Sequence, residues 1–212
     1  MPEVPWATAA ARAKGFMPDD EGMALHQAGV GAGRSGLGAL LEIGTYCGKS
    51  AVYLGAAARQ TGTVLFSVDH HRGSEELQPG WPHHDPEVVD PSTGATDTLP
   101  WARRTLWEAG LEGHVVLVVG GSTTVARYWA APLALLFIDG GHGAEVARAD
   151  FSAWVPKVAM GGTLAVHDVF SEPAQGGQVP YELYSEVLRS GEFAPTGEVG
   201  SLRLLRRTAP PT

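Results

Sequence analysis

Five short apolar runs recur along the chain without the alternation of apolar and polar residues that marks a half-exposed strand. They are rich in Val, Leu, Ile and Phe and cover 39–43, 64–68, 115–119, 133–138 and 163–166. Continuous apolar runs of this length are typical of strands buried on both faces of a parallel sheet. We therefore expect five parallel strands at these positions.

Segments with a helical spacing of apolar residues separate these runs. Over 144–158, the side chains of Ala147, Phe151 and Trp154 recur on one helix face. Further helices are expected at 20–28, 50–59, 100–109, 123–129 and 181–188. The first of these would have Asp19 or Asp20 as its N-cap. Strands that alternate with helices predict a parallel sheet covered by helices on both faces.

Two stretches complete the expected architecture. Residues 193–207 form two extended pieces joined near 197–200, which predicts an antiparallel hairpin. The fold class is then α/β, a Rossmann-like, doubly wound and mostly parallel seven-stranded sheet with a C-terminal antiparallel hairpin. We expect one domain over 1–212, with a helical cover at 1–37. Residues 70–99, rich in Pro, Gly and His, are expected to form an inserted loop without an element of its own, either functional or mobile.

Composition and charge narrow the class of protein. The 212 residues fit one domain, and the net charge of −8 gives no electrostatic footprint for nucleic acid. The single cysteine, Cys47, excludes an internal disulfide and suits a reducing compartment. Neither a secretory apolar region nor a membrane span is apparent. We expect a cytoplasmic protein with no nucleic-acid or membrane partner, and a homo-oligomer is compatible with the sequence.

Two glycine-rich stretches resemble nucleotide-binding loops. The letters GAGRSG at 31–36 match the dinucleotide fingerprint but precede the first strand, whereas the fingerprint follows a strand and opens a helix. We expect a flexible connector there. The letters GTYCGKS at 44–50 do follow a strand, but three residues separate the first two glycines where a P-loop has four. A P-loop-like nucleotide phosphohydrolase or kinase therefore stays an alternative.

The carboxyl ends of the strands carry most of the candidate chemistry, and ligands bind beyond such ends in open parallel sheets. The residues found there are Glu42 to Tyr46, Asp69, Gly120 to Ser122, Asp139, and His167 with Asp168. Asp69 follows the second strand, where a carboxylate can accept hydrogen bonds from both hydroxyls of a ribose. Lys49 is the one basic residue placed to meet a phosphate. These features favour a nucleoside ligand without phosphates.

Two motifs resemble those of a known enzyme family. LEIGTYCGKSAVYLG, residues 41–55, resembles the first motif of class I S-adenosylmethionine-dependent methyltransferases, and its GxYCGxS core is similar to that of catechol O-methyltransferases. FIDGGH…D…GGTLAVHD resembles a branch that includes the macrocin-type and mycinamicin sugar O-methyltransferases. The resemblance runs from about residue 38 to the end. It implies O-methylation of a small hydroxylated acceptor, a catechol or a sugar diol, in secondary metabolism.

The resemblance implies a place for each cofactor-binding residue. The methionine part of S-adenosylmethionine would be held by residues of the first motif, namely Glu42, Gly44, Thr45, Tyr46, Gly48 and Ser50. Asp69 and the adjacent His70 would lie at the ribose, and Ser122 would lie by the adenine. Asp139 would contribute to the same pocket.

The resemblance also implies a divalent metal, held by Asp139, His167 and Asp168. His167 departs from the family pattern, because the last pair of ligands is Asp-Asn in the catechol branch and Glu-Asp in the sugar branch. Imidazole is a softer ligand than carboxylate, so Mn²⁺, Fe²⁺ or Zn²⁺ would suit the site better than Mg²⁺. His142 stands where these branches place a lysine or histidine that takes the proton of the acceptor hydroxyl.

Plainer interpretations stay open for the same residues. Asp139 can be only the N-cap of the next helix, and His167 only a core histidine bound to a carbonyl. A lone His142 would ordinarily be a surface or capping residue. At the level of the whole protein, the alternatives are a metal-independent methyltransferase and a non-enzymatic protein that binds an adenosyl ligand.

Residues 70–99 leave the sheet directly after Asp69, beside the expected ribose. Trp81 offers an apolar plate, and polar side chains suited to an acceptor follow it: His83, His84, Asp85 and Asp90. Closure of such a loop would exclude water from the site. We expect a lid-like loop that carries acceptor specificity.

Overall fold

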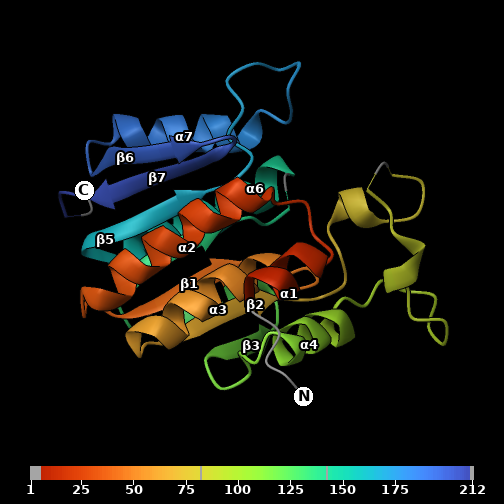
Figure 1. The fold of residues 1–212 in the computed structure, drawn as a ribbon. Helices are drawn as coiled ribbons and strands as arrows, with labels where there is room; N and C mark the ends of the chain where they lie inside the picture. The colour runs from red at the N-terminus through yellow and green to blue at the C-terminus, as the bar shows by residue number, and fades with distance from the viewer. Residues whose placement is uncertain (1–5, 82, 142, 211–212) are drawn as a thin grey trace.

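The computed structural model describes residues 6–81, 83–141 and 143–210. Its strands are β1 Ala39–Ile43, β2 Leu65–Asp69, β3 Val115–Val119, β4 Leu133–Ile138, β5 Val158–Val166, β6 Phe193–Val199 and β7 Leu202–Arg207. In the described part of the chain these strands form one seven-stranded sheet in the order β3-β2-β1-β4-β5-β7-β6 (Figure 1). β1 to β5 are parallel, and β7 pairs antiparallel with β5 and β6. The predicted Rossmann-like sheet with its C-terminal hairpin is confirmed.

Helices cover both faces of this sheet and enclose two cores. One core includes residues of α1 Trp6–Arg12, α2 Asp19–Arg34, α3 Lys49–Thr61 and α4 Leu99–Glu108. The other includes residues of α5 Ser122–Tyr128, α6 Ala144–Trp154 and α7 Val179–Arg189. Because strand side chains alternate, Phe137 of β4 enters the first core and Leu136 enters the second. All residues of β4 are buried, as the continuous apolar run predicted.

Helix α2 is longer than the sequence indicated. It extends to Arg34 through most of the glycine stretch 31–36, so the prediction of a flexible connector is wrong. A Cβ on Gly33 would come within 2.2 Å of Thr61 Oγ1 of α3, so the glycine permits close packing of the two helices. That packing outweighs the low helix propensity of glycine, about 1 kcal/mol below alanine. The N-cap is Pro18 without a capping side chain, so the expected cap at Asp19 or Asp20 is also wrong.

The boundary between α6 and β5 also differs from the prediction of one helix over 144–158. α6 ends at Trp154, and a 3-10 turn, η3 Val155–Lys157, leads directly into β5. Pro156 cannot continue an α-helix, because it lacks the amide hydrogen and its ring clashes with the preceding turn. α6 has Gly143 as its N-cap, so Asp139 is not a helix cap.

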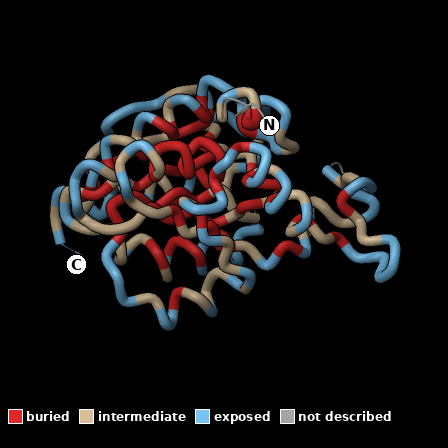
Figure 2. The backbone as a smooth tube through the Cα atoms, turned by 60° about the horizontal axis from the view of Figure 1, so that its bottom comes forward, coloured by how far each residue is buried: buried red, intermediate tan, exposed pale blue. Residues whose placement is uncertain are grey.

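Residues 70–99, which we call the arm, contain more structure than expected. They include two 3-10 helices, η1 Glu75–Leu77 and η2 Pro86–Val88, and a bridge between Val89 and Thr96. The prediction that this segment has no element of its own is therefore wrong. The arm extends sideways from the carboxyl ends of the strands (Figure 1), and most of it is exposed or half-buried (Figure 2). Among the described residues, no helix combines the length and the apolar character needed to cross a membrane.

Candidate active site

A cavity of about 940 Å³ opens at the carboxyl ends of the parallel strands. Its lining includes most of the residues singled out from the sequence: Gly44, Thr45, Tyr46, Ser50, Asp69, His70, Ser122, Asp139, His167 and Asp168. Glu42 and Gly48 are not among the lining residues, and His142 lies outside the described residues. Residues 14–17, between α1 and α2, part of the arm, residues of α6 and the loop at 170–177 also contribute to the wall.

The loop after β1 is shaped by a glycine and by a carboxylate from the neighbouring strand. Gly44 has a φ angle of 94°, and a Cβ at this position would lie 2.1 Å from the carbonyl oxygen of Asp139. Asp69 Oδ2 accepts hydrogen bonds from the amides of Thr45 and Tyr46 at 3.0 and 2.9 Å. Its Oδ1 accepts from the amide of His71 at 2.8 Å. Asp69 therefore orders the loop as well as facing the cavity.

A buried acid lies beneath this loop. Glu42 is fully buried, and its Oε1 accepts a hydrogen bond from Ser67 Oγ at 2.5 Å. Burial raises the pKa of Glu42 to about 8, the hydrogen bond from Ser67 opposes the rise, and the charges of Asp139 and Asp69 add to it. Glu42 is thus mainly a neutral carboxylic acid at pH 7, which supports the loop from below.

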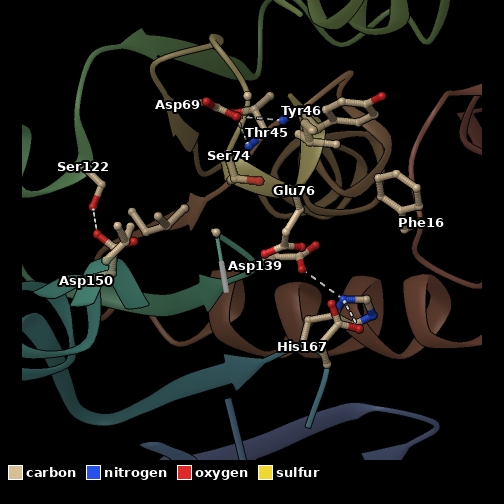
Figure 3. Close-up of a pocket in the computed structure, with 18 of the residues that line it drawn as sticks. Phe16, Thr45, Tyr46, Asp69, Ser74, Glu76, Ser122, Asp139, Asp150 and His167 are labelled. Carbon is tan, nitrogen blue, oxygen red and sulfur yellow. Dashed lines mark hydrogen bonds and ion pairs between the residues drawn. The ribbon is translucent and has the colours of Figure 1, made fainter. Parts of the chain in front are cut away.

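On the other side of the cavity, the ends of β4 and β5 bring Asp139, His167 and Asp168 together. These strands are parallel neighbours, so residues that follow them meet at one edge of the sheet. His167 Nδ1 lies 3.0 Å from Asp139 Oδ1 and 3.5 Å from Asp168 Oδ1. One ligand atom from each of the three residues lies within 4.8 Å of the others. Figure 3 shows Asp139 and His167 facing each other, with Glu76 of the arm pointing toward Asp139.

The carboxylates around His167 control its charge. Burial by itself would lower the pKa of His167. The charge and hydrogen bond of Asp139, together with Glu21 and Asp168, outweigh burial and raise that pKa to about 11. In the metal-free protein the imidazole is therefore a cation held between carboxylates.

This group of residues fits a divalent metal. The distances of 3.0 and 3.5 Å from Nδ1 to the two carboxylate oxygens are close to the separation of adjacent ligands on an ion. With metal–ligand bonds of about 2.1 Å, that separation is roughly 3 Å at right angles. Two carboxylates and one imidazole also form a donor set that first-row transition metals accept. Asp139, His167 and Asp168 could hold such an ion.

Two further features of the site escaped the sequence interpretation. Glu21 of α2 is buried against His167, with Oε2 lying 2.5 Å from Nε2. Its signal in the sequence is an acid on the same helix face as the apolar Leu25. Asp150 of α6, also buried, accepts a hydrogen bond from Ser122 Oγ (Figure 3). Burial raises the pKa of Asp150, while the hydrogen bond from Ser122 opposes this rise.

The lysine of the P-loop-like stretch is already engaged. Lys49 Nζ lies 3.5 Å from Asp19 Oδ1, and the side chain of Lys49 is 14% exposed. A P-loop lysine instead meets the phosphates of a nucleotide. This contact, together with the short spacing of the glycines, argues against a phosphate site.

Comparison with known proteins gives one family and many structures of the same fold. A family model described as a methyltransferase domain matches residues 41–169, more than half of the chain. The O-methyltransferase NovP has a similar structure, with 17% identity, a TM-score of 0.70 and coverage of 94% of this chain and 84% of that one. TomG of Streptomyces achromogenes, an O-methyltransferase of tomaymycin synthesis in complex with SAM, has 18% identity, a TM-score of 0.66 and coverages of 98% and 91%. An O-methyltransferase of Bacillus cereus in complex with SAH has 17% identity, a TM-score of 0.64 and coverages of 95% and 87%.

Proposed function

The chain belongs to the family of methyltransferase domains, and from this premise we propose that it transfers the methyl group of S-adenosylmethionine to a hydroxyl group of a small molecule. We further propose that a divalent metal at Asp139, His167 and Asp168 assists the reaction. The acceptor would be a vicinal diol of the catechol or sugar type, because two neighbouring oxygens can bind one metal.

One observation carries this proposal: a single cavity joins a nucleoside-type subsite to the acid–histidine centre. Asp69 and Ser122 lie on the side of the cavity formed by β2 and β3, and Asp139 and His167 lie on the side formed by β4 and β5. A ligand bound by the first group would place its reactive end beside the second. The similarity of the fold to TomG, whose structure holds SAM, supports the same assignment.

The two bound groups would supply the reactive chemistry. S-adenosylmethionine supplies an electrophilic methyl group on its sulfonium, and the metal supplies a Lewis acid that lowers the pKa of the acceptor hydroxyl. The loop ordered by Asp69 would hold the methionine part, while Asp69 and His70 would bind the ribose. Catalysis would then consist largely of holding the acceptor oxygen in line with the methyl group.

His142 is our candidate for the base that accepts the hydroxyl proton. The proposal rests on its position in the sequence, three residues after Asp139 and directly after Gly141, which lines the cavity. The variant His142→Ala should lower kcat by about 10²–10⁴-fold with nearly unchanged cofactor affinity. His114→Ala, outside the cavity lining, is the matched control. Unchanged turnover of His142→Ala between about pH 6 and 9 would contradict this role.

Turnover of labelled S-adenosylmethionine with a panel of catechols and sugar diols tests the function directly. We expect methyl transfer that stops after exhaustive chelation and in the variant Asp139→Asn. Full turnover after chelation would favour a metal-independent methyltransferase. Binding of the cofactor without transfer to any hydroxyl would favour a non-enzymatic binding protein. Tight ATP binding in calorimetry, with no response to S-adenosylmethionine, would favour the nucleotide phosphohydrolase or kinase.

A further inference from the structure

Glu21 is a buried acid that joins three distant parts of the fold. It lies in the first turn of α2 with 3% exposure, beyond His167 as seen from Asp139. Its Oε1 accepts a hydrogen bond from the amide of Ser201 at 2.5 Å, and its Oε2 lies 2.5 Å from His167 Nε2. A Cβ on Gly200, in the turn between β6 and β7, would come within 2.0 Å of Oε1. The carboxylate is thus fixed between α2, the end of β5 and the hairpin turn.

This contact makes Nε2 of His167 a hydrogen-bond donor. An ionised carboxylate only accepts hydrogen bonds, so Nε2 must be the donor toward Glu21. Each oxygen of this carboxylate already meets a donor, the amide of Ser201 at Oε1 and His167 Nε2 at Oε2. In the neutral imidazole the lone pair then lies on Nδ1. That nitrogen is the one that faces Asp139 and Asp168.

We propose that Glu21 is a positioning residue that holds the Nε2 proton of His167, so that Nδ1 is the third metal ligand beside Asp139 and Asp168. The centre consequently binds a first-row transition-metal dication in preference to Mg²⁺. A carboxylate behind a metal-bound histidine orients the ring and raises its basicity. Mg²⁺ favours oxygen ligands, whereas imidazole suits the transition metals.

The inference rests on the proposed function only for what the metal does in catalysis, because metal binding can be measured without acceptor or cofactor. With an ion bound, the lone pair of Nδ1 would face the metal and the N–H of Nε2 would donate to Glu21. Which ring nitrogen carries the proton in the metal-bound form can be observed directly.

The test uses the full chain, stripped of metal and titrated with Co²⁺, Mn²⁺, Zn²⁺ and Mg²⁺. We expect Co²⁺ to develop the visible absorption of a site with a nitrogen ligand, and Mg²⁺ to compete poorly. In the Zn²⁺ form, NMR of ¹⁵N-labelled histidine should show a protonated Nε2 and a metal-bound Nδ1. Mg²⁺ binding as tight as that of Mn²⁺, no binding of any of these ions, or a protonated Nδ1 in the Zn²⁺ form would overturn the proposal.

The variant Glu21→Gln preserves the shape of the side chain but removes its charge. We expect it to weaken Co²⁺ binding by about 10–100-fold, the usual effect of removing such a partner of a metal-bound histidine. Asp20→Asn, an exposed acid in the same turn, is the control and should bind Co²⁺ like the wild type. Equal Co²⁺ affinity in Glu21→Gln and the wild type would show that Glu21 has only a structural role.

A double variant tests metal choice and guards against a folding defect of the single one. His167→Glu with Glu21→Gln places a carboxylate where the sugar branch has one and avoids two facing buried acids. We expect the metal preference of this double variant to move from Co²⁺ toward Mg²⁺. If it folds and still favours Co²⁺ as strongly as the wild type does, His167 does not set the preference. Metal binding as expected without methyl transfer would refute the proposed function alone.

Discussion

At the scale of single residues, the strained backbone conformations lie at or next to the cavity. Within the described residues, the non-glycine residues with positive φ angles are Tyr46 at 47°, His71 at 59° and Asp168 at 55°. Tyr46 and Asp168 line the cavity, and His71 follows the cavity residue His70. Such conformations cost about 1–3 kcal/mol each and persist where the surrounding structure enforces them. Here the enforcing contacts include the hydrogen bonds of Asp69 to the amides of Tyr46 and His71.

Asp69 connects this strained loop to the expected ribose. The variant Asp69→Ala removes the acceptor of three backbone amides and the proposed partner of the ribose hydroxyls. We expect binding of S-adenosylmethionine to weaken by about 1–3 kcal/mol, the scale of leaving polar groups unpaired. Calorimetric titration measures this change, with Asp90→Ala, on the arm and outside the cavity lining, as the control. Equal affinity in both variants would contradict a role in binding.

Glu42 makes the stability of the protein depend on pH. In the unfolded chain its carboxyl group ionises near its ordinary pKa of 4.5, whereas in the folded protein it stays protonated up to about pH 8. Between these values the native state holds more protons, so the free energy of unfolding falls as the pH rises. Above about pH 8 the carboxyl group is ionised in both the folded and the unfolded state, so the free energy of unfolding no longer falls. The variant Glu42→Gln has no proton to lose and should lack this decline.

Urea unfolding of wild type and Glu42→Gln at about pH 5, 7 and 9 checks this expectation. The free energy of unfolding of Glu42→Gln, relative to that of the wild type, should rise by a few kcal/mol from about pH 5 to about pH 9. Hydrogen bonds from Ser92 and Thr93 lower the pKa of Asp90, so this carboxyl group is ionised in the folded and unfolded states across this range, and Asp90→Asn should leave the pH dependence of the wild type unchanged. Parallel curves for the wild type and Glu42→Gln would show that the folded carboxyl group is ionised already at neutral pH.

At the scale of helices and strands, the sequence predicts best what depends on local burial. The runs at 39–43 and 133–138 match β1 and β4 to the residue, because burial on both faces leaves a continuous apolar signal. α2 was misjudged because its glycines serve a contact with α3 that the local sequence does not reveal. The start of β5 was missed because Gly161 and Gly162 interrupt its apolar run.

The contacts of the candidate site also fall into those that the sequence predicts and those that depend on how distant elements pack. Asp139, His167 and Asp168 were expected together because consecutive parallel strands end at one edge of the sheet, and the structure brings them together. The contact of Glu21 with His167 joins residues 146 positions apart in the sequence. No motif or periodicity links them, since the contact depends on how α2 packs over the sheet. The class of enzyme was recognisable from two motifs, and the family match confirms it.

The arm is fastened to the segment that closes the cavity from the N-terminal side. Lys14 Nζ lies 2.6 Å from Asp85 Oδ2 and 2.5 Å from Glu87 Oε2, and these hydrogen bonds raise the pKa of Lys14. The rings of Phe16 and His83, both at the cavity, are 5.3 Å apart. The side chains of Lys14 and Asp85 are 27% and 25% exposed and that of Glu87 is 67% exposed. Ion pairs in contact with solvent contribute little individually, so the contact can open without a large loss of stability. This arrangement supports the lid-like role proposed for the arm.

Replacing residues 74–94 by a short Gly/Ser linker tests that role. The linker variant should keep cofactor binding, because Asp69 and His70 stay in place, and should raise the acceptor KM or abolish turnover. Lys14→Met, which leaves the chain of the arm intact, should raise the KM by a smaller factor. Steady-state kinetics with varied acceptor measures both effects. Wild-type kcat/KM in the linker variant would identify the arm as a surface decoration.

At the scale of the whole molecule, the candidate site and a buried structural ion pair lie at opposite ends of the sheet. The cavity lies at the carboxyl ends of the parallel strands. At the opposite end, Arg207 of β7 is 2% exposed and donates hydrogen bonds to the carbonyl oxygens of Pro156 and Val158 at 2.9 and 2.8 Å. Its other terminal nitrogen donates to Glu192 Oε2 at 2.9 Å. Arg207 thus ties the C-terminal hairpin to the start of β5, at the end of the sheet opposite the cavity.

This separation predicts that stability and ligand binding respond independently to mutation. Arg207→Met would leave the carboxylate of Glu192 without its buried cationic partner, and breaking such a pair costs about 3–5 kcal/mol. We expect urea unfolding to show a loss of this size and calorimetry to show wild-type affinity for S-adenosylmethionine. Arg206→Met, on the exposed side of the same strand, should change stability by no more than about 0.5 kcal/mol. Equal stability of the two variants would contradict the structural role of Arg207. A loss of cofactor affinity in the folded Arg207→Met protein would show that the two ends of the sheet are coupled.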